Sequence, residues 1–254
     1  MLSGQVGIVT GGAQGIGKGC AEALLDNGAN VCLLDVNEGV LKKTTRELAN
    51  KFSKDRVISC HCDVRNQTQM EGAFKMADET FKRIDIVINN AGVADEVMWQ
   101  RNIDINYGGV LRGTLLALEY MNKGKGGIVI NISSAAGLVA VPHAPVYCAS
   151  KHAIVGLTRS IGEHPLYRQK GIRCIALCPM SVDTDMFRSE AKDTQEFLES
   201  FGLLKVQDLA DALIEVIGDQ DNSGRIMVIV KGRRYYVDLP NLKQIVGFDV
   251  HSKM

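Results

Sequence analysis

The sequence has no excess of either charge. Lys and Arg together number 29, and so do Asp and Glu, which gives a formal net charge of +0 at pH 7. A chain balanced in this way builds no large field of one sign that would gather the phosphates of a nucleic acid or an anionic membrane. We therefore do not expect nucleic acid as a partner.

Long apolar runs are missing too. No stretch of about 18 apolar residues exists that could cross a bilayer as a helix. Residues 1–4 lead straight into an apolar strand pattern rather than into a targeting segment. The sequence thus predicts no membrane span and a cytoplasmic protein.

No disulfide framework is evident. The seven cysteines are an odd number, and most lie inside apolar, strand-like runs, which favours reduced, buried thiols. Cys60, His61 and Cys62 are metal-ligating types, but a strand would direct both cysteines to the same face, and no second cluster follows. We expect no metal site.

Aromatic residues are scarce at 6%, whereas hydrophobic residues make up 46% of the chain and Gly numbers 26. This mixture is typical of a covered parallel sheet with tight strand-to-helix turns. Short apolar runs alternate with amphipathic stretches, as in repeated βαβ units. The runs predict strands at 5–10, 30–35, 56–61, 84–89, 126–132, 171–178 and 225–230, and helices near 15–27, 38–52, 67–81, 101–122, 147–163 and 207–218. The length favours one α/β domain, a doubly wound Rossmann-type sheet spanning 1–254.

Two segments break this rhythm. Residues 184–203 follow Pro179, are partly polar and contain scattered large apolar side chains, so they are a candidate substrate lid. The tail at 231–254 has no clear period and packs either over the site or against another subunit; the sequence does not decide between them.

A glycine-rich loop follows the first predicted strand and opens the first predicted helix. It reads TGGAQGIG over residues 10–17. Gly11 permits the tight turn, Gly15 lets the backbone approach a pyrophosphate, and Gly17 lets helix and strand pack closely. A run of glycines alone can be merely a turn.

Asp35 strengthens the dinucleotide reading. It ends the second predicted strand, where a carboxylate can accept hydrogen bonds from both hydroxyls of an adenosine ribose. The same carboxylate would repel the 2′-phosphate of NADP, and no Arg follows it, so NAD is the expected cofactor. The alternative is an Asp that only caps the next helix.

Tyr147 and Lys151 are four residues apart and hence on one face of a predicted helix. An ammonium beside a phenol favours the phenolate, which a general acid/base at neutral pH needs. Such a pair also occurs by chance on solvated helix faces. Ser134, however, ends the fifth predicted strand, at the sheet edge where ligands bind, and could hold a substrate oxygen.

Taken in order, these motifs resemble those of the short-chain dehydrogenase/reductase family along nearly the whole chain. The glycine loop matches TGxxxGxG, residues 89–92 match NNAG, Asn106 matches a helix Asn, and residues 147–151 match YxxxK. The resemblance implies a seven-stranded Rossmann fold of order 3-2-1-4-5-6-7. It also implies homo-oligomers, dimers first and tetramers second, built from the helices near 101–122 and 147–163.

The same resemblance implies further site residues. Lys151 would bind the nicotinamide ribose, and Asn106 would hold a water that continues a proton relay, unless it only bridges backbone groups in its helix. The positions that would complete the cofactor site are Gln14, Ile16, Asp63, Val64, Asn89, Tyr147, Val182 and Thr184. Asp63 and Val64 would contact the adenine, Asn89 the adenosine ribose, and the last two the nicotinamide end.

Within the family the sequence is most similar to the NAD-dependent dehydrogenases of 15-hydroxyprostaglandins. It departs from them where Ala144 replaces a substrate-binding Gln, and where Met180 follows Pro179 in place of a Gly. His143 is a candidate to replace the missing hydrogen bond. Met180 and Met186 are candidates to line an apolar substrate pocket, with packing under a loop as the alternative.

We therefore expect a secondary alcohol to be oxidised to a ketone by NAD, with Ser134, Tyr147, Lys151 and Asn106 as the catalytic set. The expected substrate is hydrophobic, a hydroxylated lipid such as a 15-hydroxyprostaglandin first and an isoprenoid or aliphatic alcohol second. A catalytically silent dinucleotide-binding scaffold is the rival from another class, but a scaffold has no need of an intact Ser, Tyr and Lys set.

Overall fold

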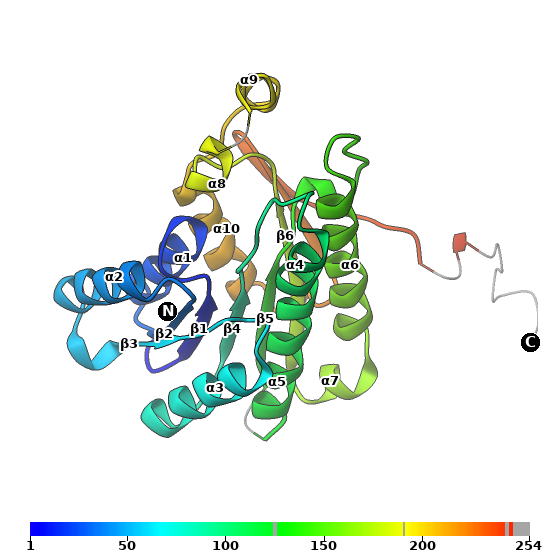
Figure 1. The fold of residues 1–254 in the computed structure, drawn as a ribbon. Helices are drawn as coiled ribbons and strands as arrows, with labels where there is room; N and C mark the ends of the chain where they lie inside the picture. The colour runs from blue at the N-terminus through cyan, green and yellow to red at the C-terminus, as the bar shows by residue number, and fades with distance from the viewer. Residues whose placement is uncertain (124–125, 190, 242–243, 246–254) are drawn as a thin grey trace, which may run out of the picture.

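A single mixed sheet with helices on both faces forms the body of the protein. The computed structural model describes residues 1–123, 126–189, 191–241 and 244–245. The sheet has the order β3-β2-β1-β4-β5-β6-β7-β8 (Figure 1). The predicted doubly wound fold is confirmed, with one correction: an eighth strand extends the expected seven.

The first seven strands are parallel and match the predicted runs within two residues. They are β1 (Val6–Thr10), β2 (Asn30–Asp35), β3 (Val57–His61), β4 (Ile86–Asn89), β5 (Gly127–Ile132), β6 (Ile172–Pro179) and β7 (Ile226–Val230). The central strands are buried along their length because helices cover both faces, which is why they read as continuous Val, Ile and Leu runs. β1 pairs with both β2 and β4, so the strand order reverses between β1 and β4. In an open α/β sheet this reversal opens the crevice in which ligands bind.

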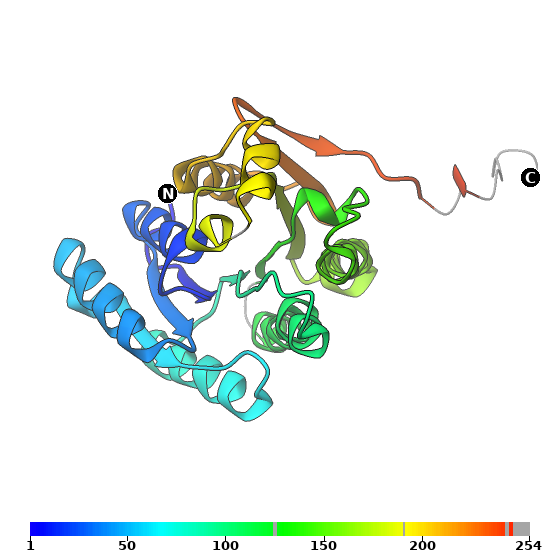
Figure 2. The same cartoon turned by 45° about the horizontal axis from the view of Figure 1, so that its top comes forward.

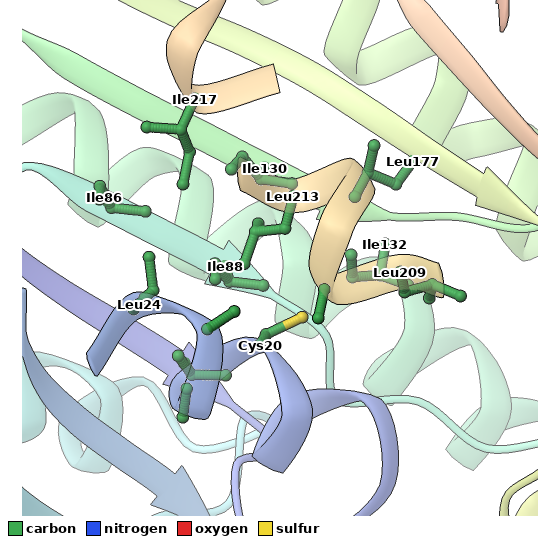
Figure 3. Close-up of a cluster of buried hydrophobic side chains, with 14 of the residues drawn as sticks. Cys20, Leu24, Ile86, Ile88, Ile130, Ile132, Leu177, Leu209, Leu213 and Ile217 are labelled. Atoms are coloured by element: carbon green, nitrogen blue, oxygen red, sulfur yellow. The ribbon is translucent and has the colours of Figure 1, made fainter. Parts of the chain in front are cut away.

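The helices divide between the two faces. They are α1 (Gly15–Asp26), α2 (Glu38–Lys51), α3 (Gln67–Phe81), α4 (Trp99–Ile103), α5 (Val110–Lys123), α6 (Pro145–Gly162), α7 (Pro165–Gln169), α8 (Asp185–Arg188), α9 (Lys192–Glu199) and α10 (Val206–Gly218), with one-turn helices at Lys54–Arg56 and Ala135–Gly137. Helices α1, α2 and α10 lie on one face of the sheet, and α3 and α5 lie on the other (Figure 2). Buried side chains of α1, α2 and α10 form one apolar cluster on the sheet, and those of α3 and α5 contribute to a second. In the first cluster Leu24, Leu209 and Leu213 pack over the isoleucines of β4 and β5 (Figure 3).

The long helix predicted at 101–122 is not regular. Between α4 and α5 the backbone forms a π segment, Asp104–Gly109, that inserts an extra residue into the helical turn. Asn106, a predicted site residue, lies inside this segment and is fully buried. The hydrophobic period gives no signal for such an insertion.

The tail contains the unexpected strand. After a turn at Gly232, which has a φ of 79°, β8 (Arg233–Val237) pairs antiparallel with β7. Beyond β8, the guanidinium of Arg159 on α6 donates to the carbonyl oxygens of Leu239 (3.1 Å) and Pro240 (2.9 Å). The described part of the tail is thus held against β7 by strand pairing and against α6 by the Arg159 hydrogen bonds. The rest of the predicted tail, 242–243 and 246–254, lies outside the described residues.

The candidate lid is an excursion whose two ends meet. Val182 and Leu204 form an isolated parallel bridge, in which the Asp183 N–H donates to the Leu204 carbonyl oxygen (2.9 Å) and the Leu204 N–H to the Ser181 carbonyl oxygen (2.9 Å). Between them stand α8 and α9, and α9 has no buried residue. Both short helices lie above the carboxyl edge of the sheet (Figure 1). No helix in the described residues is both long and apolar enough for a bilayer crossing.

Candidate active site

The glycine loop joins β1 to α1 in the expected way. Gly11 and Gly15 have φ values of 63° and 54°, left-handed conformations that side chains with a Cβ rarely adopt. A Cβ on Gly17 would lie 2.1 Å from the Gly11 carbonyl oxygen, so no other residue fits there. Gln14 is exposed at the end of the loop, and the partly buried Ile16 packs against the core.

The start of α1 fits a dinucleotide phosphate. Its N-cap, Gln14, makes no side-chain capping bond, and the first turn contains no acidic residue. The first N–H groups of a helix bind anions when nothing else caps them, and the helix dipole favours negative charge there. Asp35 ends β2 beside this loop, where its carboxylate accepts the N–H of Ala13 (3.0 Å) and the N–H of Asn37 (2.9 Å). The residues present therefore fit NAD.

The two asparagines at the end of β4, Asn89 as its last residue and Asn90 directly after it, direct their side chains to opposite faces of the sheet. Asn90 was not predicted; its Nδ2 donates to the carbonyl oxygens of Thr10 (3.0 Å) and Gly11 (3.1 Å), and so ties β4 to the glycine loop. Asn89 is only 1% exposed, and its Nδ2 donates to Asn131 Oδ1 (2.8 Å) and Thr114 Oγ1 (3.2 Å) beneath α5. The Asn89 side chain, expected beside the adenosine ribose, is thus directed into the core, because successive strand residues face opposite ways.

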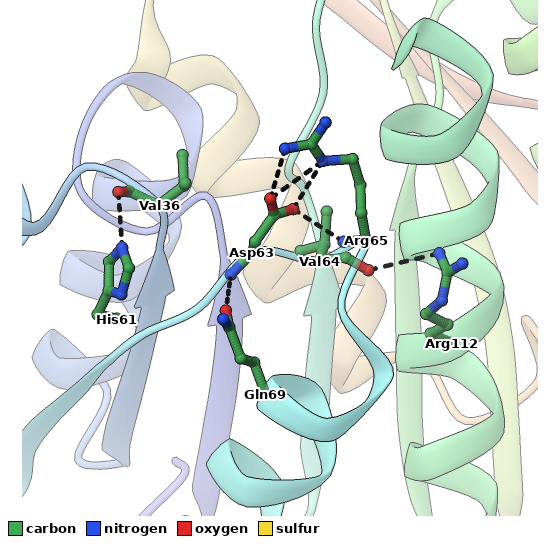
Figure 4. Close-up of polar contacts among 7 residues, drawn as sticks. All are labelled: Val36, His61, Asp63, Val64, Arg65, Gln69 and Arg112. Atoms are coloured by element: carbon green, nitrogen blue, oxygen red, sulfur yellow. Dashed lines mark hydrogen bonds and ion pairs between the residues drawn. The ribbon is translucent and has the colours of Figure 1, made fainter. Parts of the chain in front are cut away.

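Asp63 and Val64, the expected adenine contacts, follow the end of β3. This strand pairs with β2, which in turn pairs with β1, the strand before the glycine loop. The Asp63 carboxylate is held by a fork of hydrogen bonds from Arg65, including Nη2 to Oδ2 at 2.6 Å (Figure 4). This guanidinium lowers the pKa of the Asp63 carboxyl below its usual range. Val64 is 7% exposed and packs where Gly109 leaves room for it. Arg65 is therefore a second charged group at this end of the site, and the sequence motif gave no signal for it.

Tyr147 and Lys151 lie together on α6. The Lys151 Nζ is 5.5 Å from the centroid of the Tyr147 ring, and it donates to the Ile132 carbonyl oxygen at 3.0 Å. Lys151 is 4% exposed, and burial rather than a carboxylate partner dominates its surroundings. Burial lowers the pKa of Lys151 to about 8, so the amine is still mostly cationic at pH 7. Burial raises the pKa of the nearby Cys178 thiol to about 11, which leaves that thiol neutral.

Ser134 lies at the end of β5, under the start of α6. Its Oγ accepts the N–H of Ala136 at 3.2 Å, which leaves the hydroxyl hydrogen to be donated elsewhere. The adjacent Ser133 is buried and donates to the Lys151 carbonyl oxygen at 2.9 Å, which fastens α6 to the end of β5. The fold thus brings Ser134, Tyr147 and Lys151 to one edge of the sheet, as the sequence predicts.

The Asn106 amide bridges three neighbouring segments. Its Oδ1 accepts the Val93 N–H (2.8 Å), and its Nδ2 donates to the Val93 carbonyl oxygen (2.9 Å), to Asn102 Oδ1 (2.9 Å) and to Ser150 Oγ (3.1 Å). The side chain therefore joins the loop after β4 to α4 and α6. These partners lie in a loop and on other helices rather than among the backbone groups of its own helix, and the water-holding role of Asn106 stays a prediction.

The expected substrate residues do not all line one surface. His143 is exposed and Ala144 is the N-cap of α6. Met180 packs against the core, which fits the packing alternative for it, whereas Met186 on α8 is 40% exposed. Of the two predicted nicotinamide contacts, Val182 is buried, and the Thr184 Cγ2 is 3.5 Å from the position of a Cβ built on Gly15. Thr184 thus places the start of α8 directly against the glycine loop.

Comparison with known proteins agrees with this architecture. The family described as short chain dehydrogenase matches residues 5–195. The 15-hydroxyprostaglandin dehydrogenase [NAD(+)] of Mus musculus is 40% identical over 247 residues, with 91% of this chain and 92% of the relative covered. The 3beta-hydroxysteroid dehydrogenase 2 of Eggerthella lenta is 38% identical over 196 residues, covering 73% of this chain and 74% of the relative.

A solved structure gives the same picture for the fold. The crystal structure of levodione reductase superposes with a TM-score of 0.84 at 25% identity, and covers 91% of this chain and 98% of that one. The matched family spans the glycine loop, the Ser134, Tyr147 and Lys151 set and the start of the candidate lid. The chain belongs to the short-chain dehydrogenase family.

Proposed function

We propose that this dehydrogenase oxidises the carbinol of a hydrophobic, hydroxylated lipid, such as a 15-hydroxyprostaglandin, to a ketone with NAD⁺. The observation that supports it most is the buried Lys151 ammonium, 5.5 Å from the centroid of the Tyr147 ring, at the edge of the sheet where the glycine loop begins. As a member of its family the chain is an NAD-dependent oxidoreductase that acts on alcohols.

When bound, NAD⁺ supplies the acceptor for the hydride of the carbinol carbon. The Ser134 hydroxyl donates a hydrogen bond to the substrate oxygen, because its own oxygen already accepts the Ala136 N–H. The Tyr147 phenolate then removes the hydroxyl proton as a general base. Lys151 favours that phenolate electrostatically, since a charge in a site closed to water is screened far less than one at the surface.

The proton must return to water after each turnover. Because the Asn106 amide is already engaged by Val93, Asn102 and Ser150, we assign the relay water to the main-chain carbonyl oxygen of Asn106. A π segment supports this, because it interrupts the regular pattern in which each carbonyl oxygen accepts a helical N–H. Asn106 then fixes the relay through its backbone, and its side chain fixes the backbone.

The apolar surface of the candidate lid supports a hydrophobic substrate. Phe197 and Phe201 are 56% and 54% exposed and form an edge-to-face pair with centroids 5.1 Å apart. Met186 on α8 adds a third exposed apolar side chain to the same segment. An isoprenoid or aliphatic alcohol stays the second candidate, and the similarity to a hydroxysteroid dehydrogenase adds a polycyclic alcohol to it. We propose the homodimer through the helices α5 and α6, where Leu115 is 52% exposed.

The test is turnover by the purified chain with NAD⁺. Hydroxylated fatty acids, prostaglandins, hydroxysteroids and simple secondary alcohols are offered in turn, and NADH formation is followed by its absorbance. Tyr147→Phe should abolish turnover while NADH binding, followed by fluorescence, persists. Tyr235→Phe removes the hydroxyl of a 42% exposed side chain on β8, away from the site, and serves as the matched control. Absence of NADH formation with every alcohol would refute the proposal, and normal turnover by Tyr147→Phe would refute the assigned base.

A further inference from the structure

The helix that carries Tyr147 has no cap of its own. Its N-cap residue is Ala144, whose side chain cannot accept a hydrogen bond, and Pro145 at the first helical position has no N–H. The first regular helical bond runs from the Cys148 N–H to the Ala144 carbonyl oxygen (2.9 Å). Two N–H groups of the first turn, those of Val146 and Tyr147, therefore need an acceptor from elsewhere.

Glu96 supplies that acceptor from a different part of the chain. Its Oε2 accepts the Val146 N–H at 2.9 Å, and its Oε1 accepts the Tyr147 N–H at 2.8 Å. Both remaining donors of the turn are thus satisfied by one carboxylate, about fifty residues away in sequence. The negative charge also lies at the positive end of the helix dipole, where it stabilises the helix.

The loop that presents Glu96 is itself held in place. Asn106 bonds both backbone groups of Val93, and the Asn102 Nδ2 donates to the Asp95 carbonyl oxygen at 3.0 Å. At the opposite end the Asp95 carboxylate accepts the Met98 N–H at 2.9 Å and pairs with Arg101. The carboxylate of Glu96 is therefore offered to α6 from a fixed support.

We propose that Glu96 is a positioning residue for Tyr147, a role that rests on the proposed function. Tyr147 is the third residue of α6, so the bond to its own N–H fixes its Cα relative to the loop after β4. The same loop begins at Gly92, where a Cβ would lie 3.6 Å from the Lys151 Nζ and 3.3 Å from Asn106 Oδ1. Glu96 thus sets the distance between the phenol and the loop that borders the rest of the catalytic set. Small displacements of a catalytic group cost large factors in rate.

The experiment compares Glu96→Ala and Glu96→Gln with Asp95→Ala. The glutamine retains one acceptor oxygen and tests rescue, while Asp95→Ala loosens the same loop without removing a bond to α6. Hydrogen exchange of the Val146 and Tyr147 amides is measured together with kcat, KM and NADH affinity. We expect exchange to rise about fivefold in Glu96→Ala, the factor that corresponds to the loss of a helix cap. Asp95→Ala should leave these two amides unchanged.

The kinetic expectation separates positioning from stability. Glu96→Ala should lower kcat about tenfold, with KM and NADH affinity within about twofold, and Glu96→Gln should fall between Glu96→Ala and the unmodified enzyme. An active chain in which Glu96→Ala keeps kcat within twofold, or loses no more than Asp95→Ala does, overturns the positioning role alone. If the unmodified chain oxidises no alcohol, the proposed function fails and the positioning role fails with it, although amide exchange still reports the cap. If Glu96→Ala does not fold, Glu96→Gln with unchanged kcat and exchange overturns the role.

Discussion

Replacing Lys151 by Met should make the protein more stable and less active at the same time. The buried Lys151 has a pKa of about 8, against 10.5 for an ordinary lysine, because burial disfavours its charge. The folded state therefore binds this proton less tightly than the unfolded state. Below pH 8 both states are protonated, and the full penalty, about 3 kcal/mol for a shift of this size, opposes folding. As pH rises from 8 towards 10.5 the folded state loses its charge, and the penalty fades.

A methionine side chain of similar length carries none of this penalty. The variant loses the hydrogen bond to the Ile132 carbonyl oxygen, which removes roughly 1 kcal/mol of this gain. The free energy of unfolding of Lys151→Met at pH 7 should therefore be about 2 kcal/mol higher than that of the unmodified protein. Urea unfolding at pH 7, 8, 9 and 10 measures this difference. The difference in free energy of unfolding between the variant and the unmodified protein should decrease steadily from pH 7 to pH 10, because the charge penalty on Lys151 in the unmodified protein disappears.

Catalysis should move the other way. With the Lys151 Nζ at 5.5 Å from the ring centroid, an effective dielectric constant of about 20 gives a charge effect of about 3 kcal/mol. That corresponds to a fall of roughly a hundredfold in kcat at pH 7. The deficit should be largest below pH 8 and narrow above it, where Lys151 itself loses its charge. Lys75→Met on the exposed face of α3 is the control. A variant that is less stable at pH 7, or a deficit that does not depend on pH, would refute the reasoning.

Two further predictions concern the cofactor loop and the candidate lid. Gly17→Ala would place a Cβ 2.1 Å from the Gly11 carbonyl oxygen, so NADH affinity measured by fluorescence should fall at least tenfold. The control is Gly72→Ala, where nothing lies within 4 Å of the added Cβ; this variant should bind NADH normally and be slightly more stable. Phe197→Ala should raise KM for a long apolar alcohol about fivefold and leave 2-propanol kinetics and thermal unfolding unchanged, because α9 has no buried residue; an equal effect on both alcohols would argue against substrate contact.

The parallel core could be predicted from the sequence because its signals are local. The apolar run at 30–35, for example, ends at Asp35, as β2 does in the structure. The glycines at 11, 15 and 17 likewise indicate the turn between β1 and α1 directly. β8 escaped prediction because its sequence, RRYYV, lacks an apolar period and is stabilised by pairing with β7 rather than by burial.

Inside the site, the missed features depend on contacts between distant segments. The π segment that holds Asn106 follows from bridges to Val93 and Ser150, neither of which is visible in a helical period. Asn89 is the last residue of β4 and Asn90 follows it, so their side chains face opposite ways. The motif match does not say which of the two side chains faces the cofactor site. The role of Glu96 could not be predicted for the same reason. The sequence around Ala144 shows no capping residue, and the acceptor comes from a loop about fifty residues earlier. The roles of the predicted site residues stay predictions until variants are measured.

The bridge between Val182 and Leu204 holds together the two ends of the segment that contains α9. Because both ends of 183–203 are joined by main-chain bonds next to β6 and α9 has no buried residue, the side chains of α9 can be exchanged without altering the strand registers below. Selection for a new alcohol could therefore change the residues of α9 while the hydride-transfer residues stay the same. Replacing the α9 residues by those of a relative offers a direct route to a changed substrate range.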